Sequence, residues 1–232
     1  MISSICLIIA GAGASSRFGG EVGKIYLPIA GKSVFLWALD CFKEFGEISQ
    51  KLLVVSPDDM PMVSRQWGEE LEKRNTQLVA GGKRRFDSVQ AALAVVKSSV
   101  ALVAVHDAAR PMTDRQSIAA AFTKAGRSGA AIVAQQVNQT LKLANSNGCV
   151  SHVSNREHYW LAQTPQVFDR ELLVKAYAAW GNAKNTQEEA TDDAQVVEAY
   201  GHEVHVVAGG TGNIKITTPE DLKLVEAMLL KN

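Results

Sequence analysis

The sequence predicts an α/β protein with a doubly wound, mostly parallel sheet and a protruding β-hairpin arm. Short, uniformly apolar runs recur along the chain, as expected for strands buried on both faces of a parallel sheet. Amphipathic helix patterns separate these runs, which gives the strand–helix alternation of such folds. One stretch, residues 138–160, instead alternates polar and apolar residues around a turn and predicts the hairpin.

The first half of the chain supplies most of the expected sheet. Uniformly apolar runs, ended by glycines or by turn residues, predict strands at residues 5–9, 52–55, 77–80, 100–105 and 130–133. Apolar residues at helical spacing predict the helices between them, at residues 33–45, 62–74, 88–96 and 114–125. Ligands of such sheets bind beyond the carboxyl ends of the strands, so the segments after each strand are the candidate site.

The last part of the chain returns to this alternation after the hairpin. Helices are expected at residues 170–180 and 188–200, and strands at 204–207 and 213–216. A final helix begins after Thr218, because a capping Thr is followed by Pro219 and, three residues after the cap, by Asp221.

The hairpin segment has two interpretations. Residues 145–148 read Asn-Ser-Asn-Gly, a turn sequence between two alternating runs. An isolated hairpin is only marginally stable, so it is either a surface flap or an arm that binds a second copy of the chain. The sequence of this segment favours neither the flap nor the arm.

Composition limits the class of protein. The 232 residues suit one domain over residues 1–232, with 138–160 as a subregion. Lys and Arg (24) balance Asp and Glu (24), which argues against nucleic acid or an anionic membrane as a partner. No apolar run approaches the roughly 20 residues of a membrane span, and no signal peptide is recognisable. Three cysteines without a CxxC pair indicate a reducing, cytoplasmic compartment.

A long glycine-rich loop follows the first strand. Residues 10–20 read Ala-Gly-Ala-Gly-Ala-Ser-Ser-Arg-Phe-Gly-Gly, and Gly23-Lys24 comes shortly after. Neither a dinucleotide fingerprint nor a Walker A motif fits, since Ser16 and Tyr26 stand where glycines are needed. The loop is either a tight turn or a triphosphate site in which backbone N–H groups, Arg17 and Lys24 meet the phosphates. The two cations favour the triphosphate site.

Polar residues also follow two later strands. Asp107 and Arg110 lie in His-Asp-Ala-Ala-Arg-Pro, where they can hold a metal, a ribose or a phosphate, or simply pair with each other. Gly81-Gly82 can admit a base edge, with Ser88 or Asp87 capping the next helix. The basic residues 83–85 are interpreted as solvated surface.

A fourth group is dispersed: Thr140, Arg156, Lys215 and Gln163-Thr164-Pro165-Gln166. Alternation places Lys215 opposite its apolar neighbours, which is also the pattern of a charged edge-strand residue. Asp192-Asp193 resembles a metal pair, but acids at a helix start also complement the helix dipole, and we prefer that interpretation.

Taken together and in order, these motifs resemble the 2-C-methyl-D-erythritol 4-phosphate cytidylyltransferase (IspD) family over almost the whole chain. His-Asp-Ala-Ala-Arg-Pro and Asn213-Ile-Lys-Ile-Thr are the specific elements. The resemblance implies a Rossmann-like nucleotidyltransferase domain, the substrates CTP and a polyol phosphate, Mg²⁺, and a homodimer in which each arm helps to complete the partner's site.

The resemblance also implies roles for individual residues. Arg17, Lys24, Arg156 and Lys215 would be catalytic. The nucleotide would contact Gly11, Ala12, Gly13, Arg17, Lys24, Gly82, Ser88, Asp107 and Lys215. The sugar phosphate would contact Asp107, Ala108, Arg110, Thr140, Arg156, Thr164 and Lys215. Mg²⁺ would be held mainly by the CTP phosphates, with Asp107 as a possible ligand.

The implied reaction suits these residue types. A phosphate monoester is largely a dianion at neutral pH, so its attack on the α-phosphorus of CTP requires cations rather than a general base. Three alternatives remain, of which a sugar-1-phosphate nucleotidyltransferase is the most distant. Ribitol-5-phosphate cytidylyltransferases share the loop and its lysine, although Ala109 favours the methylerythritol family. The glycine loop departs from the family pattern at Ala10, Gly11 and Ser15, which keeps a catalytically inactive nucleotide-binding module open.

Overall fold

The computed structural model describes residues 4–13, 23–182 and 190–231, and its centre is a seven-stranded sheet. The strand order is β11-β7-β10-β6-β1-β4-β5. In chain order the strands are β1 (Ile5–Ala10), β4 (Ile48–Val55), β5 (Thr76–Ala80), β6 (Leu102–Asp107), β7 (Ala130–Gln136), β10 (Trp160–Asp169) and β11 (His205–Ala208). All pair in parallel except β10, which is antiparallel to β6 and β7. The expected α/β class with a mostly parallel sheet is therefore confirmed.

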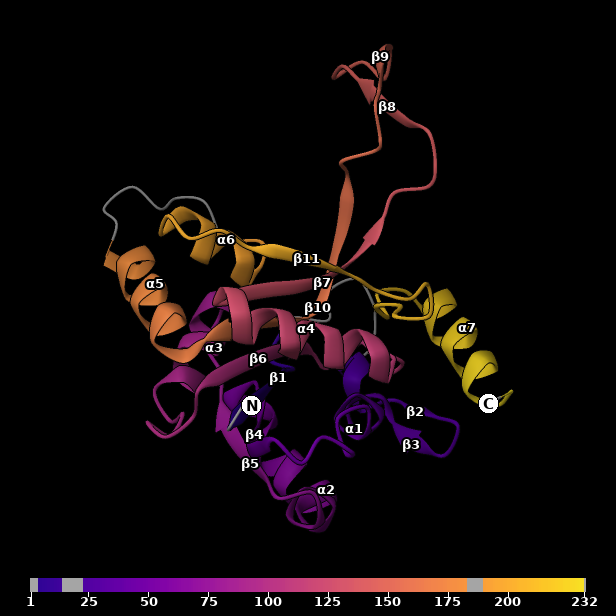
Figure 1. Ribbon diagram of the computed structural model, residues 1–232. Coiled ribbons are helices and arrows are strands. Elements are labelled where there is room, and N and C mark those ends of the chain that lie inside the picture. The colour runs from indigo at the N-terminus through magenta and orange to yellow at the C-terminus, as the bar shows by residue number, and fades with distance from the viewer. Residues whose placement is uncertain (1–3, 14–22, 183–189, 232) are drawn as a thin grey trace.

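Helices cover both faces of this sheet (Figure 1). One face is covered by α1 (Val34–Asp40), α2 (Met60–Lys73) and α4 (Arg115–Ser128), the other by α3 (Arg85–Leu93), α5 (Arg170–Asn182) and α6 (Asp193–Ala199). Strand β1 shows why its sequence is uniformly apolar. Ile5, Leu7 and Ile9 pack into the first layer, whereas Cys6 and Ile8 pack into the second.

The C-terminal helix packs beside the main sheet. Helix α7 (Pro219–Leu229) begins as expected, with Thr218 and Asp221 forming a reciprocal cap. It shares a small apolar cluster with Ile29 of β2 (Pro28–Ile29), the strand that pairs with β3 (Lys32–Ser33). Ile214 and Ile216, in the segment that precedes α7, pack in the same cluster.

The structure differs from the expected elements in several places. The helix expected at residues 188–200 begins at Asp193, and residues 188–189 lie outside the described part of the chain. Strand β10 was not expected, because its buried Gln163, Thr164 and Gln166 interrupt the apolar run. Residues 213–216 form no strand, and Ile216 N–H donates instead to the Ala109 carbonyl (2.9 Å). Helix α3 begins at Arg85 rather than Ser88, because Asp87 accepts from the backbone of Arg84 and completes the cap there. Helix α1 ends at Asp40, five residues early.

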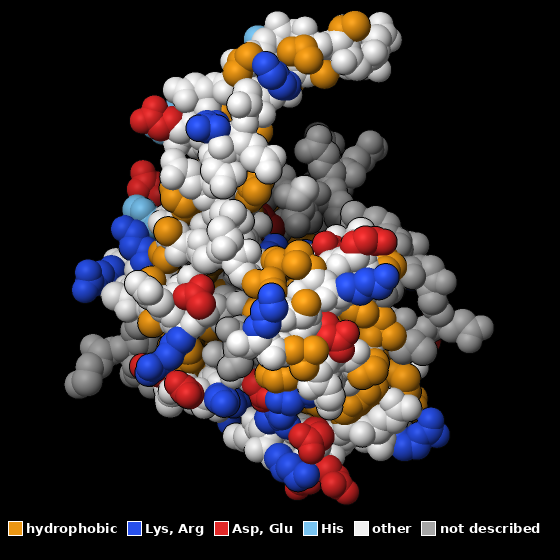
Figure 2. All heavy atoms as spheres, turned by 90° about the vertical axis from the view of Figure 1, so that its right-hand side faces the viewer, with side chains coloured by type: hydrophobic (Ala, Val, Ile, Leu, Met, Phe, Trp, Pro, Cys, Tyr) orange, Lys and Arg blue, Asp and Glu red, His pale blue; other side chains and the backbone are white. Residues whose placement is uncertain are grey.

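The hairpin is present where the sequence predicts it. Strands β8 (Leu141–Ala144) and β9 (Val150–Ser154) pair antiparallel, and Gly148 lies in the turn with φ +78°. The hairpin stands clear of the rest of the protein in Figure 1, and Figure 2 shows apolar side chains near its tip. Leu143, Val150 and Val153 are each more than half exposed. Among the described residues, no helix is both long and apolar enough to span a bilayer.

Candidate functional site

The candidate site lies at the carboxyl ends of β1 and β6. The two strands are paired, and their last residues, Ala10 and Asp107, are directly opposite each other. The chain after β1 stays close to the sheet, because Gly11 N–H donates to the Val54 carbonyl (2.8 Å). A Cβ atom on Gly11 would lie 2.8 Å from Ile25 and 2.9 Å from that carbonyl, so only glycine fits there.

Two hollows meet at this edge of the sheet. The first, of about 180 Å³, is lined by Ala10, Gly11, Ala12, Gly13, Lys24, Ile25, Arg85, Ser88, Asp107, Ala109, Lys215 and Thr217. The second, of about 210 Å³, is lined by Arg85, Asp107, Arg110, Ala162, Gln163, Thr164, Gln166, Thr191, Asp192 and Lys215. Arg85, Asp107 and Lys215 line both. We call the first the glycine-loop hollow, the second the β10 hollow, and the space at these three residues the junction.

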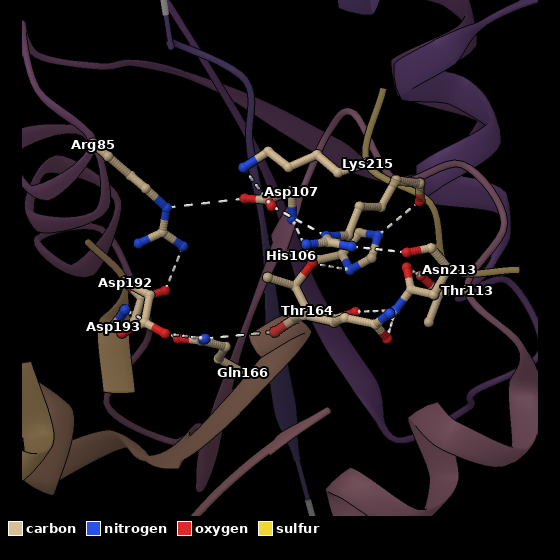
Figure 3. A network of polar contacts seen from close by, with 12 residues as sticks. Arg85, His106, Asp107, Thr113, Thr164, Gln166, Asp192, Asp193, Asn213 and Lys215 are labelled. Carbon is tan, nitrogen blue, oxygen red and sulfur yellow. Dashed lines mark hydrogen bonds and ion pairs between the residues drawn. The ribbon is translucent and has the colours of Figure 1, made fainter. Parts of the chain in front are cut away.

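Asp107 is the electrostatic centre of the junction (Figure 3). Its Oδ2 faces Lys215 Nζ at 2.9 Å and Arg110 Nε at 3.3 Å, and its Oδ1 faces Arg85 Nε at 3.9 Å. Burial would raise the pKa of this carboxyl, but the charges of Lys215, Arg85 and Arg110 hold the pKa well below its ordinary value. Asp107 is therefore ionised throughout the physiological range and orients the three cations.

Asn213 fixes the segment that carries Lys215. Its side-chain amide donates to the Gln163 side chain (3.1 Å) and the Thr164 carbonyl (2.9 Å). Its Oδ1 accepts from Thr113 (2.8 Å), and its backbone carbonyl accepts from Arg110 (2.8 Å). Ile216, one residue beyond Lys215, is fully buried on the opposite side, so the expected alternation holds without a strand.

His106 is part of the support for Asp107 and does not face either hollow. Its Nε2 lies 3.0 Å from the Arg110 carbonyl and its Nδ1 lies 2.9 Å from Thr164 Oγ1, which also accepts from Asp107 N–H. Burial lowers its pKa to about 4. A neutral ring that donates from Nε2 and accepts at Nδ1 satisfies all of these contacts.

The buried neutral histidine predicts an acid-dependent loss of stability. The folded pKa of His106 is about 4 and the ordinary value is 6.5, so the unfolded chain binds more protons between them. The free energy of unfolding should therefore fall by about 2–3 kcal/mol between pH 7 and pH 4.5. Urea titrations should give a shallower pH slope for His106→Gln and an unchanged slope for His152→Gln, which alters an exposed histidine of β9. Equal slopes for His106→Gln and the wild type would contradict the assignment.

The structure brings together part of the expected site. Gly11, Ala12, Gly13, Lys24 and Ser88 line the glycine-loop hollow, and Arg110 and Thr164 line the β10 hollow. Gly82 and Ala108 line neither; Gly82 N–H donates to Ser88 Oγ (3.1 Å), and Ala108 is fully buried beside Gly11. Thr140 and Arg156 lie on the hairpin and line neither hollow, and Arg17 lies outside the described residues.

Sequence reasoning missed one junction residue. The run of basic residues 83–85 predicts solvated surface, but Arg85 Nη2 pairs with the fully buried carboxylate of Asp193 at 2.6 Å. That partner is 108 positions away in the chain, so no local pattern reveals the pair. Asp192 lies at the start of a helix, as expected, and caps α6 by accepting from Gln195 N–H (2.9 Å). Asp193, by contrast, is an ion-pair partner and does more than complement the helix dipole.

The donor set at the junction does not resemble a resident metal site. Both Asp107 oxygens already face cations, and the described residues contain no group of three His, Cys, Asp or Glu side chains suited to a metal ion. Backbone N–H groups, lysine and arginine are instead donors for phosphate oxygens.

A mostly parallel α/β sheet with phosphate-type donors at the carboxyl ends of its strands is the arrangement expected of a nucleotidyltransferase. The family model described as "IspD: 2-C-methyl-D-erythritol 4-phosphate cytidylyltransferase" matches residues 5–231. The chain belongs to this family, as its motifs indicated.

Individual relatives agree with this assignment. The 2-C-methyl-D-erythritol 4-phosphate cytidylyltransferase of Bacteroides fragilis is 40% identical over 96% of this chain and 98% of its own. That of Rhodopirellula baltica is 37% identical over 98% and 95%. Among solved structures, the 4-diphosphocytidyl-2C-methyl-D-erythritol synthase of Anaerococcus prevotii matches with a TM-score of 0.84 at 28% identity, covering 98% of this chain and 96% of its own. The Thermus thermophilus cytidylyltransferase matches with 0.78 at 33% identity, covering 98% of both chains.

Proposed function

We propose that this protein transfers a cytidylyl group from CTP to 2-C-methyl-D-erythritol 4-phosphate, releasing pyrophosphate. The observation that carries the proposal is the meeting of two hollows at Lys215, Asp107 and Arg85. In this assignment the glycine-loop hollow takes the nucleotide and the β10 hollow takes the sugar phosphate. The names of the relatives favour this substrate over ribitol 5-phosphate, and an enzyme over an inactive binding module.

The chemistry needs charge compensation more than proton transfer. The attacking phosphate is largely a dianion at neutral pH, so no side chain has to remove a proton. Two like unit charges 4 Å apart repel by about 4 kcal/mol at an effective dielectric of 20. Lys24 and Lys215, with Arg17 from the loop, would offset that repulsion and the charge that develops on the leaving pyrophosphate. In-line positioning by the two hollows would lower the barrier further.

We also propose that Mg²⁺ enters bound to the CTP phosphates. Its chemical contribution there is to neutralise charge on the triphosphate. The commitment of Asp107 to Lys215, Arg110 and Arg85 supports this route over a metal held by Asp107. Dialysis against a chelator should then leave the fold intact, and turnover should require added Mg²⁺.

The hairpin is proposed to act on a second copy of the chain. Thr140 and Arg156 lie on an arm that projects from the protein, and the arm exposes apolar side chains that a partner could cover (Figure 1). We propose a cytoplasmic homodimer in which Arg156 and Thr140 reach the β10 hollow of the partner. The arm of residues 138–160 would then be the dimerisation element of a single domain spanning residues 1–232.

A pyrophosphate-release assay tests the function. CTP and Mg²⁺ are supplied with 2-C-methyl-D-erythritol 4-phosphate or ribitol 5-phosphate. We expect release with the first substrate and at least 10-fold slower release with the second. Faster release with ribitol 5-phosphate would favour the alternative enzyme. CTP binding without release from either substrate would favour the inactive module.

Arg156→Ala is expected mainly to raise KM for the sugar phosphate, because this cation would hold its phosphate group. A change confined to KM for CTP would contradict the assignment. At a sugar-phosphate concentration far below the raised KM, where neither variant alone turns over appreciably, an equal mixture of Arg156→Ala and Lys24→Ala subunits should restore about a quarter of wild-type activity. Half of the dimers then contain one complete site of two. If light scattering shows a monomer and that monomer has full activity, the arm does not complete the site of a second subunit.

A further inference from the structure

Arg85 lies at the junction in a position that no assigned role explains. It lines both hollows, and its side chain is 23% exposed. Its Nη2 pairs with Asp193, while its Nε lies 3.9 Å from Asp107, beyond hydrogen-bond distance. Within the described part of the chain, Nη1 makes no hydrogen bond or ion pair, and Figure 3 draws that nitrogen without a contact.

Contacts on the side away from the hollows fix the position of the Arg85 guanidinium. Tyr177 donates to Asp193 Oδ1 (2.5 Å), and Asp193 Oδ2 accepts from Arg85. The ring of Tyr177 stacks on Phe86, the residue next to Arg85, with centroids 4.7 Å apart and planes within 7°. Tyr177 therefore supports Arg85 in two ways: through Phe86 next to its backbone, and through Asp193 at its guanidinium.

A second contact fixes the helix that supplies Asp193. Gln166 of β10 is buried, and its side-chain oxygen accepts from the backbone N–H groups of Asp193 and Ala194, both at 3.0 Å. Its amide donates to Asp192 (2.9 Å). The start of α6 is therefore tied to the strand that forms one wall of the β10 hollow.

A buried ion pair is weak evidence for a purely structural role, because desolvation offsets most of its attraction. This one instead orients an arginine whose remaining edge opens onto two hollows. A planar guanidinium with a fixed edge is suited to bind phosphate oxygens. Resting on the proposed function, we propose that Arg85 is a further substrate-contacting residue that donates from its free edge to the phosphates where nucleotide and sugar phosphate meet.

Arg85→Lys is the decisive variant, with Arg85→Gln beside it. Lysine keeps the charge that Asp193 needs but lacks a second edge for phosphate. We expect Arg85→Lys to lower kcat at least 10-fold and Arg85→Gln at least 100-fold. Arg65→Gln, which removes an exposed arginine of α2, is the charge-matched control and should stay within threefold of the wild type. Steady-state kinetics with CTP and methylerythritol phosphate would be measured alongside melting temperatures.

The kinetic readout separates this role from a structural one. A structural Arg85 predicts a lower melting temperature with kcat of the folded protein within threefold of wild type, and that result would overturn the proposal. Tyr177→Phe leaves every charge in place and should lower kcat about fivefold by loosening Asp193. If the Arg85 variants do not fold, an unchanged kcat in Tyr177→Phe overturns the proposal instead. Absence of turnover in the wild type would count against the proposed function, whereas active Arg85 variants would count only against this inference.

Discussion

Replacing Lys24 by alanine is expected to lower kcat by at least about 100-fold, the usual cost of removing one donor that stabilises a transition state. Lys24 lines the glycine-loop hollow together with Lys215. It begins the short helix η1 (Lys24–Tyr26), whose Tyr26 stacks on Trp67 with ring centroids 5.6 Å apart. Because the backbone that carries Lys24 is held by this packing, its ammonium group is preorganised and needs little reorganisation during the reaction.

Arg17→Ala is expected to lower kcat by a similar factor, because the family resemblance implies that Arg17, like Lys24, contacts the triphosphate of CTP. Lys43→Ala, on an exposed turn after α1, serves as the control. Turnover of either loop variant within threefold of the wild type, measured by pyrophosphate release at saturating CTP, would remove that residue from the catalytic group.

Asp107→Asn is expected to have the largest effect on stability. The change leaves the side chain nearly the same size but removes the one charge that Lys215, Arg110 and Arg85 share. Breaking such a buried arrangement typically costs about 3–5 kcal/mol, because Lys215 and Arg110 lose their counter-ion and the three cations, of which only Arg85 keeps another carboxylate partner, repel one another. Activity should fall as well, since Lys215 loses the contact that orients it.

The stability change can be measured by urea unfolding at pH 7. The folded-state pKa of Asp107 is depressed, so its contribution is present at neutral pH and is lost only in strong acid. Asp58→Asn, which changes an exposed carboxylate, should alter the free energy of unfolding by less than about 0.5 kcal/mol. A loss below about 1 kcal/mol for Asp107→Asn would show that the three cations do not depend on this carboxylate.

Errors in predicting the elements arose where polar residues are buried by distant partners. Strand β10 is not predicted because Gln163, Thr164 and Gln166 are polar and typical of a loop. In the structure they are buried, and their hydrogen-bond partners are Asn213, His106 and the start of α6 respectively. Residues 213–216 have the alternation of a strand, but their contacts are with Ala109 and α7 rather than with a sheet neighbour. The local pattern of apolar and polar residues predicts which side chains are buried, but it does not predict which distant residues they contact.

The candidate site divides in the same way. Local sequence identified the glycine loop, Asp107, Arg110 and the alternation around Lys215, because each depends on a strand end or on a short motif. It could not identify Arg85 as a site residue, since that role depends on Asp193, 108 positions further along the chain. It also could not show that His106 is a supporting residue, which follows only from its burial between Thr164 and Arg110.

The α/β class, the hairpin and the family could all be predicted from the amino-acid sequence, because apolar periodicity, turn residues and motif spacing are properties of neighbouring residues. The grouping of Lys215, Arg85 and Arg110 around one carboxylate, and the meeting of two hollows there, became apparent from the folded chain alone. The reason is physical: charges from β6, α3 and the segment before α7 interact through space. Their separations depend on how the sheet and its helices pack, which no stretch of neighbouring residues specifies.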